Sequence, residues 1–223
     1  MKNQGDTGAD WSFYSVASTR IEPFSRVINL GSGHHFKFEI GLRKSHPHVE
    51  ILSVDLGTPE TVPDGCEYLP ANIEGNLPLI VGSKKFDVAC LFEVLEHIDK
   101  TDVCLQNVRE ILSDDGRVLI SIPNLSSIYA RIELLLGFQP HVLEVSNEVG
   151  PLGMGPFGRL NYGEKTTPLH HIRGITLRGL IGLLEHNGLR VRHVWGFNPG
   201  IPLWPRKHLQ KLASSVLVEA VLA

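Results

Sequence analysis

The chain has 223 residues, with 21 Lys and Arg against 24 Asp and Glu, a formal net charge of -3 and 42% hydrophobic residues. This length suits one α/β domain with a sizeable core. The near-neutral charge argues against a dedicated nucleic-acid-binding protein, which would carry a basic stripe. No apolar stretch approaches the ~20 residues that a membrane-spanning helix requires.

The cysteines and the first ten residues indicate the cellular compartment in which the protein is expected. The three cysteines are odd in number and form no C-x-x-C pair (Cys66, Cys90 and Cys104). Met1 to Asp10 is polar, without the apolar core of a signal peptide. We therefore expect a cytoplasmic protein with no metal site, since the spacing fits neither a disulfide framework nor a zinc site.

The segment before the first strand, residues 1–25, is rich in bulky side chains: Trp11, Phe13, Tyr14 and Ile21. One interpretation is a helix that covers an edge of the sheet. The other is a flap over a bound ligand, with an aromatic face that meets a cationic or planar group. The sequence leaves both open.

Val27 to Leu30 has the continuous apolar character of a buried parallel strand, and a glycine turn follows it at Gly31-Ser32-Gly33. The second apolar run, Val49 to Val54, ends at Asp55. A carboxylate one strand away from a glycine turn can accept hydrogen bonds from both hydroxyls of a ribose. The pair therefore predicts a nucleoside-binding site.

The longest specific string begins at Phe86-Asp87 and ends in Glu93-Val94-Leu95-Glu96-His97. It resembles F-D-x-x-x-x-x-E-V-L-E-H, the fourth strand and following turn of a broad group of class I S-adenosylmethionine-dependent methyltransferases. This group includes the ubiquinone-pathway O-methyltransferases and many small-molecule and glycan-modifying relatives. The glycine turn, Asp55, the loop around Asn72-Ile73 and the strand Arg117 to Asn124 resemble further segments of that family, in the same order. The resemblance covers about residues 26–124.

This resemblance implies an α/β fold: a Rossmann-like, doubly wound, seven-stranded sheet, mostly parallel with an antiparallel C-terminal strand. Residues 1–223 would form a single domain that binds S-adenosyl-L-methionine and releases S-adenosyl-L-homocysteine. The implied cofactor-binding residues are Asn29, Gly31, Ser32, Gly33, Asp55, Leu56, Asn72, Ile73, Phe92 and Glu93.

Three residues depart from the patterns of nucleotide-binding families. Asn29 replaces the usual acidic residue of the methyltransferase turn, and His35 replaces its third glycine. Phe36 stands where a dinucleotide fingerprint has its third glycine, which weighs against NAD or FAD. Adjacent positions at a helix start diverge, so we expect no metal pair from His34 and His35.

Residues 125–176 follow the fifth strand, where the family covers its acceptor site. Ile128 to Leu136 predicts a helix, whereas Gly150 to Gly158 is too rich in glycine and proline for either helix or strand. We expect Gly150 to Gly163 to be mobile and to order over a bound acceptor. Parts of this insert resemble a subgroup that acts on sugars or surface glycans.

The predicted reaction is O-methylation of a small molecule: a sugar, a glycan precursor or a related metabolite. A hydroxyl acceptor benefits from a nearby base, for which His97 is the first candidate and His171 the second. Two alternatives remain. One is a methyltransferase-like binding protein without activity, suggested by Asn29 and His35. The other is a nicotinamide-dependent sugar enzyme, which Phe36 disfavours.

Overall fold

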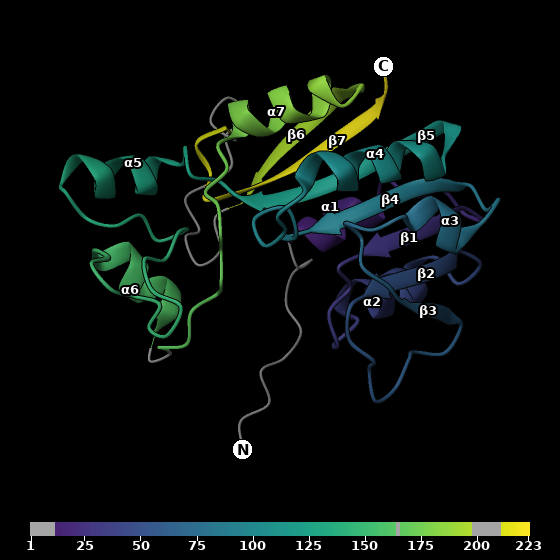
Figure 1. The fold of residues 1–223 in the computed structure, drawn as a ribbon, viewed down its shortest axis with the longest axis horizontal. Helices are drawn as coiled ribbons and strands as arrows, with labels where there is room; N and C mark the ends of the chain where they lie inside the picture. Colours follow the sequence, from purple (N-terminus) through teal and green to yellow (C-terminus); the bar gives the residue numbers. More distant parts are fainter. Residues whose placement is uncertain (1–11, 164–165, 198–210) are drawn as a thin grey trace.

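The computed structural model describes residues 12–163, 166–197 and 211–223. Its strands are β1 (Arg26–Leu30), β2 (Glu50–Asp55), β3 (Cys66–Pro70), β4 (Phe86–Phe92), β5 (Leu112–Pro123), β6 (Leu189–Phe197) and β7 (Ser215–Leu222). They form one seven-stranded sheet in the order β3-β2-β1-β4-β5-β7-β6 (Figure 1). β7 runs antiparallel to both of its neighbours, β5 and β6, and the other strand pairs are parallel. The predicted fold class is confirmed.

The described helices are α1 (Phe13–Ser18), α2 (Lys37–Ser45), α3 (Leu77–Val81), α4 (Thr101–Ile111), α5 (Ile128–Leu135), α6 (Pro156–Tyr162) and α7 (Leu177–His186). Figure 1 shows α3, α4 and α7 on one face and α1 and α2 on the other. Helices α5 and α6 lie beyond the end of the sheet, at the left of the view.

The alternation of side chains along each strand divides the core into two layers. Ile28 and Leu30 pack in the cluster that includes α3, α4 and α7. Val27 points the other way and packs with Phe38 of α2 in the second cluster. Because both faces of β1 are covered, Val27 to Leu30 is apolar apart from Asn29, which is also buried.

One expected turn is instead part of a strand. The sequence predicts that the chain turns at Ser113 to Gly116 and that the fifth strand begins at Arg117. In the structure β5 begins at Leu112, which pairs with Phe86, while Arg117 pairs with Val88. The intervening residues therefore bulge out of the ladder, and the Ser113 hydroxyl donates to Asp87 at 3.3 Å.

The described part of the N-terminal segment, residues 12–25, contains α1, whose first turn is closed by a capping box between Ser12 and Ser15. Phe13 and Tyr14 pack their rings 5.7 and 5.2 Å from that of Phe92 in β4. Residues 1–11, and with them Trp11, lie outside the described residues. The part of the segment that the structure describes contacts the sheet.

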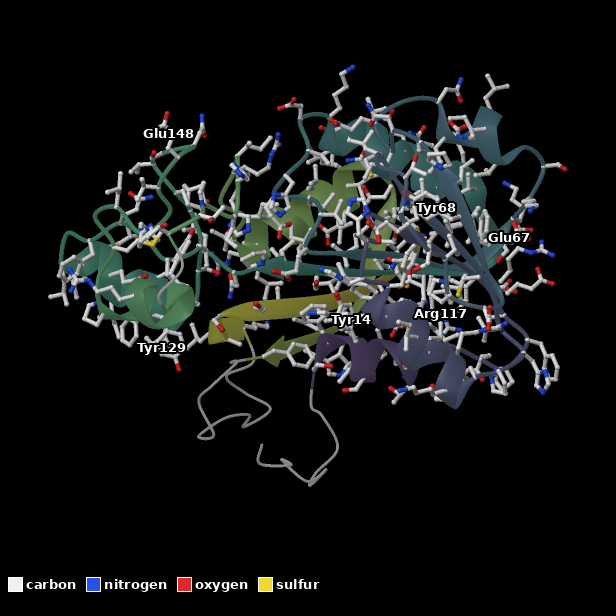
Figure 2. The ribbon with its side chains drawn as sticks, turned by 90° about the horizontal axis from the view of Figure 1, so that it is seen from below. Tyr14, Glu67, Tyr68, Arg117, Tyr129 and Glu148 are labelled. Atoms are coloured by element: carbon white, nitrogen blue, oxygen red, sulfur yellow. The ribbon has the colours of Figure 1, made fainter. Side chains whose placement is uncertain are left out.

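The insert, residues 125–176, forms a separate lobe in its described parts. The amide of Leu125 donates to the carbonyl of Ile175 at 2.9 Å, so the insert begins and ends at one point. Figure 2 shows Tyr129 and Glu148 on this lobe, away from Tyr14 and Tyr68 on the body of the sheet.

The prediction that Gly150 to Gly158 forms neither helix nor strand is confirmed for Gly150 to Gly155 and wrong from Pro156 on, where α6 begins. Proline is tolerated in a first helical turn, where its missing N–H has no partner to lose. A Cβ on Gly158 would lie 2.4 Å from the Cβ of Met154, so glycine permits a close approach here. The Gly158 amide donates to the carboxylate of Glu133, which is 1% exposed.

All three cysteines are free, and burial raises the pKa of the Cys90 and Cys104 thiols. In the part of the chain that the structure describes, no helix is both long and apolar enough to cross a membrane.

Candidate active site

The glycine turn after β1 places residues without side chains at the carboxyl edge of the sheet. Gly31 has φ +75°, and a Cβ there would lie 2.6 Å from Cγ2 of Val94. Gly33 has φ +66°, and a Cβ there would meet no protein atom within 4 Å. Both positions favour glycine because of their positive φ. The space beside Gly33 is open to a ligand.

Asp55, at the end of β2, holds this turn in place. One carboxylate oxygen accepts the amide of Gly33 at 2.8 Å, and the other accepts the amide of Leu56 at 2.7 Å. Each oxygen of a carboxylate has two lone pairs, so each retains one. Asp55 can therefore order the glycine turn and still accept hydrogen bonds from two ribose hydroxyls.

The loop after β3 forms the next wall. The side-chain oxygen of Asn72 accepts the amide of Glu74 at 2.8 Å. Asn107 of α4 donates its amide to the carbonyls of Ile73 at 3.0 Å and Gly75 at 2.7 Å. Asn107 was not predicted from the sequence. The sequence feature that could have identified Asn107 is a polar residue on the apolar stripe of a helix. In the structure the residue is 8% exposed.

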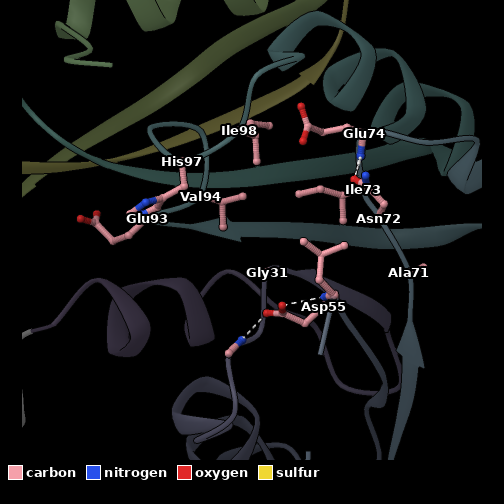
Figure 3. Close-up of a pocket in the computed structure, with 12 residues that line it drawn as sticks. Gly31, Asp55, Ala71, Asn72, Ile73, Glu74, Glu93, Val94, His97 and Ile98 are labelled. Atoms are coloured by element: carbon pink, nitrogen blue, oxygen red, sulfur yellow. Dashed lines mark hydrogen bonds between the residues drawn. The ribbon is translucent and has the colours of Figure 1, made fainter. Parts of the chain in front are cut away.

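These elements surround a cavity of about 320 Å³ (Figure 3), which lies in the size range of small-molecule sites. Most of the residues predicted to bind the cofactor line it, and so does one predicted catalytic residue: Gly31, Gly33, Asp55, Leu56, Asn72, Ile73, Glu93 and His97. Four predicted residues do not line it: Asn29, Ser32, Phe92 and His171.

Asn29 and Phe92 point into the core layer next to α2. Asn29 is 3% exposed and donates its side-chain amide to Glu39 at 2.7 Å. Glu39, fully buried in α2, also accepts the hydroxyl of Ser53 at 2.7 Å. A carboxylate therefore lies behind the glycine turn, supplied by α2 rather than by the strand. Nothing in the sequence pattern distinguished Glu39 from a surface residue of that helix.

The end of β4 places two carboxyl groups beside the cavity. Glu93 has φ +55°, an uncommon conformation for a residue with a side chain. Burial raises the pKa of Glu93 to about 7, against the opposing effect of a hydrogen bond from Ser121. Burial, and then the charge of Glu93, raise the pKa of Glu96 to about 9.

His97 and His171 come together although they are far apart in the sequence. Their ring centroids are 4.8 Å apart. Nδ1 of His97 lies 3.1 Å from the carbonyl oxygen of His170, and Nδ1 of His171 lies 2.9 Å from that of Val142. Burial lowers the pKa of His97, and the hydrogen bond to the His170 carbonyl opposes this shift. The structure thus places the two predicted catalytic histidines side by side.

Glu144 holds the insert around His171, a role that was not predicted from the sequence. It accepts the amide of His171 at 3.2 Å and that of Leu169 at 3.0 Å, and it also accepts the hydroxyl of Tyr162. Burial would raise its pKa, but the hydrogen bonds from Tyr162 and Leu169 outweigh burial and lower the pKa of Glu144.

Comparison with known proteins gives a family. Residues 12–194 match the family described as methyltransferase domain. The chain therefore belongs to the methyltransferase-domain family, and its fold is that of S-adenosylmethionine-dependent methyltransferases. No curated protein matches the sequence.

Solved structures share the fold at low sequence identity. The pyocyanin biosynthetic protein PhzM has a TM-score of 0.57 at 13% identity, over 95% of this chain and 54% of that one. The mitomycin 7-O-methyltransferase MmcR has a TM-score of 0.57 at 17% identity, over 94% of this chain and 55% of that one. A third match is a chain from a Haloferax volcanii complex between the Trm112 methyltransferase activator and the putative methyltransferase. Its TM-score is 0.61 at 12% identity, over 94% of this chain and 89% of that one. The protein thus spans about half the length of the first two.

Proposed function

We propose that the protein transfers a methyl group from S-adenosyl-L-methionine to a hydroxyl oxygen of a small molecule: a sugar, a glycan precursor or a related metabolite. The observation that carries this proposal is the convergence of Gly33, Asp55 and His97 on one cavity. MmcR, which shares the fold, is named as an O-methyltransferase, and this supports oxygen as the acceptor atom.

The residues of the cavity fit this cofactor. Asp55 retains acceptor capacity for two ribose hydroxyls. The open space beside Gly33 admits the methionine end of the cofactor, and Asn72 and Ile73 line the place expected for adenine. When bound, S-adenosyl-L-methionine supplies an electrophilic methyl group on a sulfonium. Attack by the hydroxyl oxygen yields a methyl ether, S-adenosyl-L-homocysteine and a proton.

The chain mainly has to align the acceptor and to activate its hydroxyl. Good alignment alone can supply on the order of 7–11 kcal/mol of the barrier. His97 lines the cavity, and His171 lies beside it at the insert end. We assign the activation of the hydroxyl to this pair, and the coverage of the acceptor to the insert.

Asn29 and His35 differ from the methyltransferase pattern, and this difference suggested the alternative of a binding protein without activity. Asn29 is buried away from the cavity, next to the carboxylate of Glu39, and His35 is exposed and does not line the cavity. Neither residue obstructs the proposed cofactor site, and this supports the enzyme.

Ligand binding tests the cofactor assignment. S-adenosyl-L-homocysteine should raise the melting temperature, and at ~100 times its dissociation constant the stabilisation is roughly 2.7 kcal/mol. NAD should produce no shift. Asp55→Ala should abolish most of the shift, while Asp64→Ala, an exposed carboxylate in the next loop, should retain it. An unchanged shift in Asp55→Ala, or a shift with NAD alone, contradicts the proposal.

Turnover tests the reaction. Transfer of a labelled methyl group should be measured across sugars, glycan precursors and phenols. His97→Ala should lower turnover strongly and leave the shift with S-adenosyl-L-homocysteine intact. Binding of the cofactor without turnover on any acceptor would favour the binding protein instead.

A further inference from the structure

Three side chains form a group with the composition of a metal site next to the proposed acceptor position. Glu96 and His97 lie just after β4, and His171 lies in the insert. One potential ligand atom from each lies within 4.8 Å of the others. Glu96 and His97 are neighbours in a turn rather than in a helix, which lets adjacent side chains serve one centre.

The carboxylate of Glu96 needs a partner that the described residues do not supply. Glu96 is 2% exposed, and neither of its carboxylate oxygens has a hydrogen-bond partner among the described residues. Its backbone is held in place, because its carbonyl accepts the amide of Ile172 at 2.9 Å. Buried carboxylates are normally hydrogen-bonded, paired with a cation or bound to a metal. This burial points to a ligand independently of the histidines.

Both imidazoles are held in the tautomer that metal sites use. A carbonyl oxygen can only accept, so Nδ1 of His97 donates to His170 and Nδ1 of His171 donates to Val142. Each Nε2 then carries a lone pair. Metal-bound histidines in proteins characteristically donate their other ring N–H to a carboxylate or a backbone carbonyl. The two anchoring carbonyls are therefore already in place.

We propose that Glu96, His97 and His171 bind one divalent cation of the zinc type, with open positions that take the acceptor hydroxyl. Two histidines and one carboxylate, with a free position, are the donor set of many catalytic zinc sites. Bonds of about 2.0–2.2 Å require the three ligand atoms to draw closer than their present separation. His97 is exposed and His171 is carried by the insert, so both can move inward.

The cation would act on the acceptor as a Lewis acid. The hydroxyl oxygen binds the cation and its O–H bond becomes more acidic. The proton leaves to solvent, the electron pair stays on oxygen, and that oxygen attacks the methyl group. His97 then serves as a ligand, a different task from the general base predicted from the sequence. This catalytic role rests on the proposed function, whereas binding of the cation does not.

Cobalt binding tests the site directly. The full chain is stripped with chelator and titrated with Co²⁺, and visible absorption and bound metal per chain are measured. We expect one Co²⁺ per chain, displaced by Zn²⁺. Glu96→Gln, His97→Ala and His171→Ala should each weaken Co²⁺ binding at least 100-fold. His186→Ala, an exposed histidine at the end of α7, should leave it unchanged.

The outcomes separate this inference from the proposed function. Each variant is accepted as folded only if its far-ultraviolet circular dichroism matches that of the native protein and its thermal unfolding remains cooperative. No Co²⁺ binding, Co²⁺ binding unchanged in His171→Ala, or equal loss in His186→Ala overturns the cation site and leaves the cofactor assignment standing. Co²⁺ binding that requires Glu96, His97 and His171 supports the site even if no acceptor is methylated. Methyl transfer unaffected by chelator in a metal-free protein overturns the catalytic role.

Discussion

The cavity and the insert beside it are built in different ways. On the proposed cofactor side, residues that line the cavity lie at the end of a strand or in the turn that follows it, as Asp55 and Gly33 do. On the proposed acceptor side, single carboxylates of the insert accept hydrogen bonds from separate stretches of the chain. Glu133 accepts the amide and the imidazole of His141 and the amide of Gly158.

This difference determines how each side responds to change. The cofactor side derives its shape from a sheet with two covered faces, so one lost contact leaves many others. The insert lies beyond the end of the sheet (Figure 1), and Glu133 joins α5 to His141 and to Gly158 of α6. Substitutions at single buried polar residues should therefore affect the insert more than the sheet.

The largest effect is expected at Glu133. Glu133→Ala leaves three donors without their acceptor inside the insert, and breaking such a buried pair costs about 3–5 kcal/mol. Hydrogen exchange should show residues 125–163 opening while the shift with S-adenosyl-L-homocysteine persists. Glu148→Ala, an exposed glutamate of the same lobe, should change stability by no more than about 0.5 kcal/mol. Loss of cofactor binding in Glu133→Ala would show that the two sides are not independent.

A smaller effect is expected at Asn107, the buried polar contact on the cofactor side. Asn107→Ala leaves the carbonyls of Ile73 and Gly75 without their donor, at a cost of about 1–3 kcal/mol. Urea unfolding should report this loss, and S-adenosyl-L-homocysteine should bind more weakly. Gln106→Ala, on the exposed side of the same helix, is the matched control. Equal stability of the two variants would contradict the anchoring role.

Glu39→Gln tests whether the buried carboxylate compensates for Asn29. The substitution keeps the shape of the side chain and removes its charge. The affinity for the positively charged S-adenosyl-L-methionine should fall relative to that for neutral S-adenosyl-L-homocysteine by about five-fold, or ~1 kcal/mol. Isothermal titration with both ligands measures this ratio. Glu50→Gln, an exposed carboxylate paired with Arg26, should leave the ratio unchanged; a fall there too would indicate a general charge effect.

The smallest effect is expected at His35, which replaces the third glycine of the turn. Its side chain is exposed and does not line the cavity, so His35→Gly should leave binding of S-adenosyl-L-homocysteine equal or slightly tighter. A ten-fold loss, about 1.4 kcal/mol, would show that the imidazole contacts the ligand. Titration of the variant beside the native protein decides this.

The sequence predicted most of the cavity lining because position along a strand determines position at the edge of a sheet. Val27 to Leu30 and Asp55 follow from this rule and from the apolar pattern alone. The contacts of Glu39, Asn107 and Glu144 do not, because they join residues whose proximity depends on how helices and loops pack. The grouping of Glu96, His97 and His171 also depends on how the insert packs against the turn after β4. The expectation of no metal site was drawn only from the cysteines and from His34 and His35, so it did not consider these three residues.

The position of β7 has a consequence for biosynthesis. This strand follows β6 in the chain but lies between β5 and β6, and its residues Val216, Leu217 and Val218 are fully buried. While the chain is being synthesised, β5 therefore keeps an open hydrogen-bonding edge and β6 has no strand to pair with. An unpaired edge of this kind is a template for association between chains. The nascent protein remains exposed to aggregation until residues Ser215–Leu222 have left the ribosome and closed the sheet.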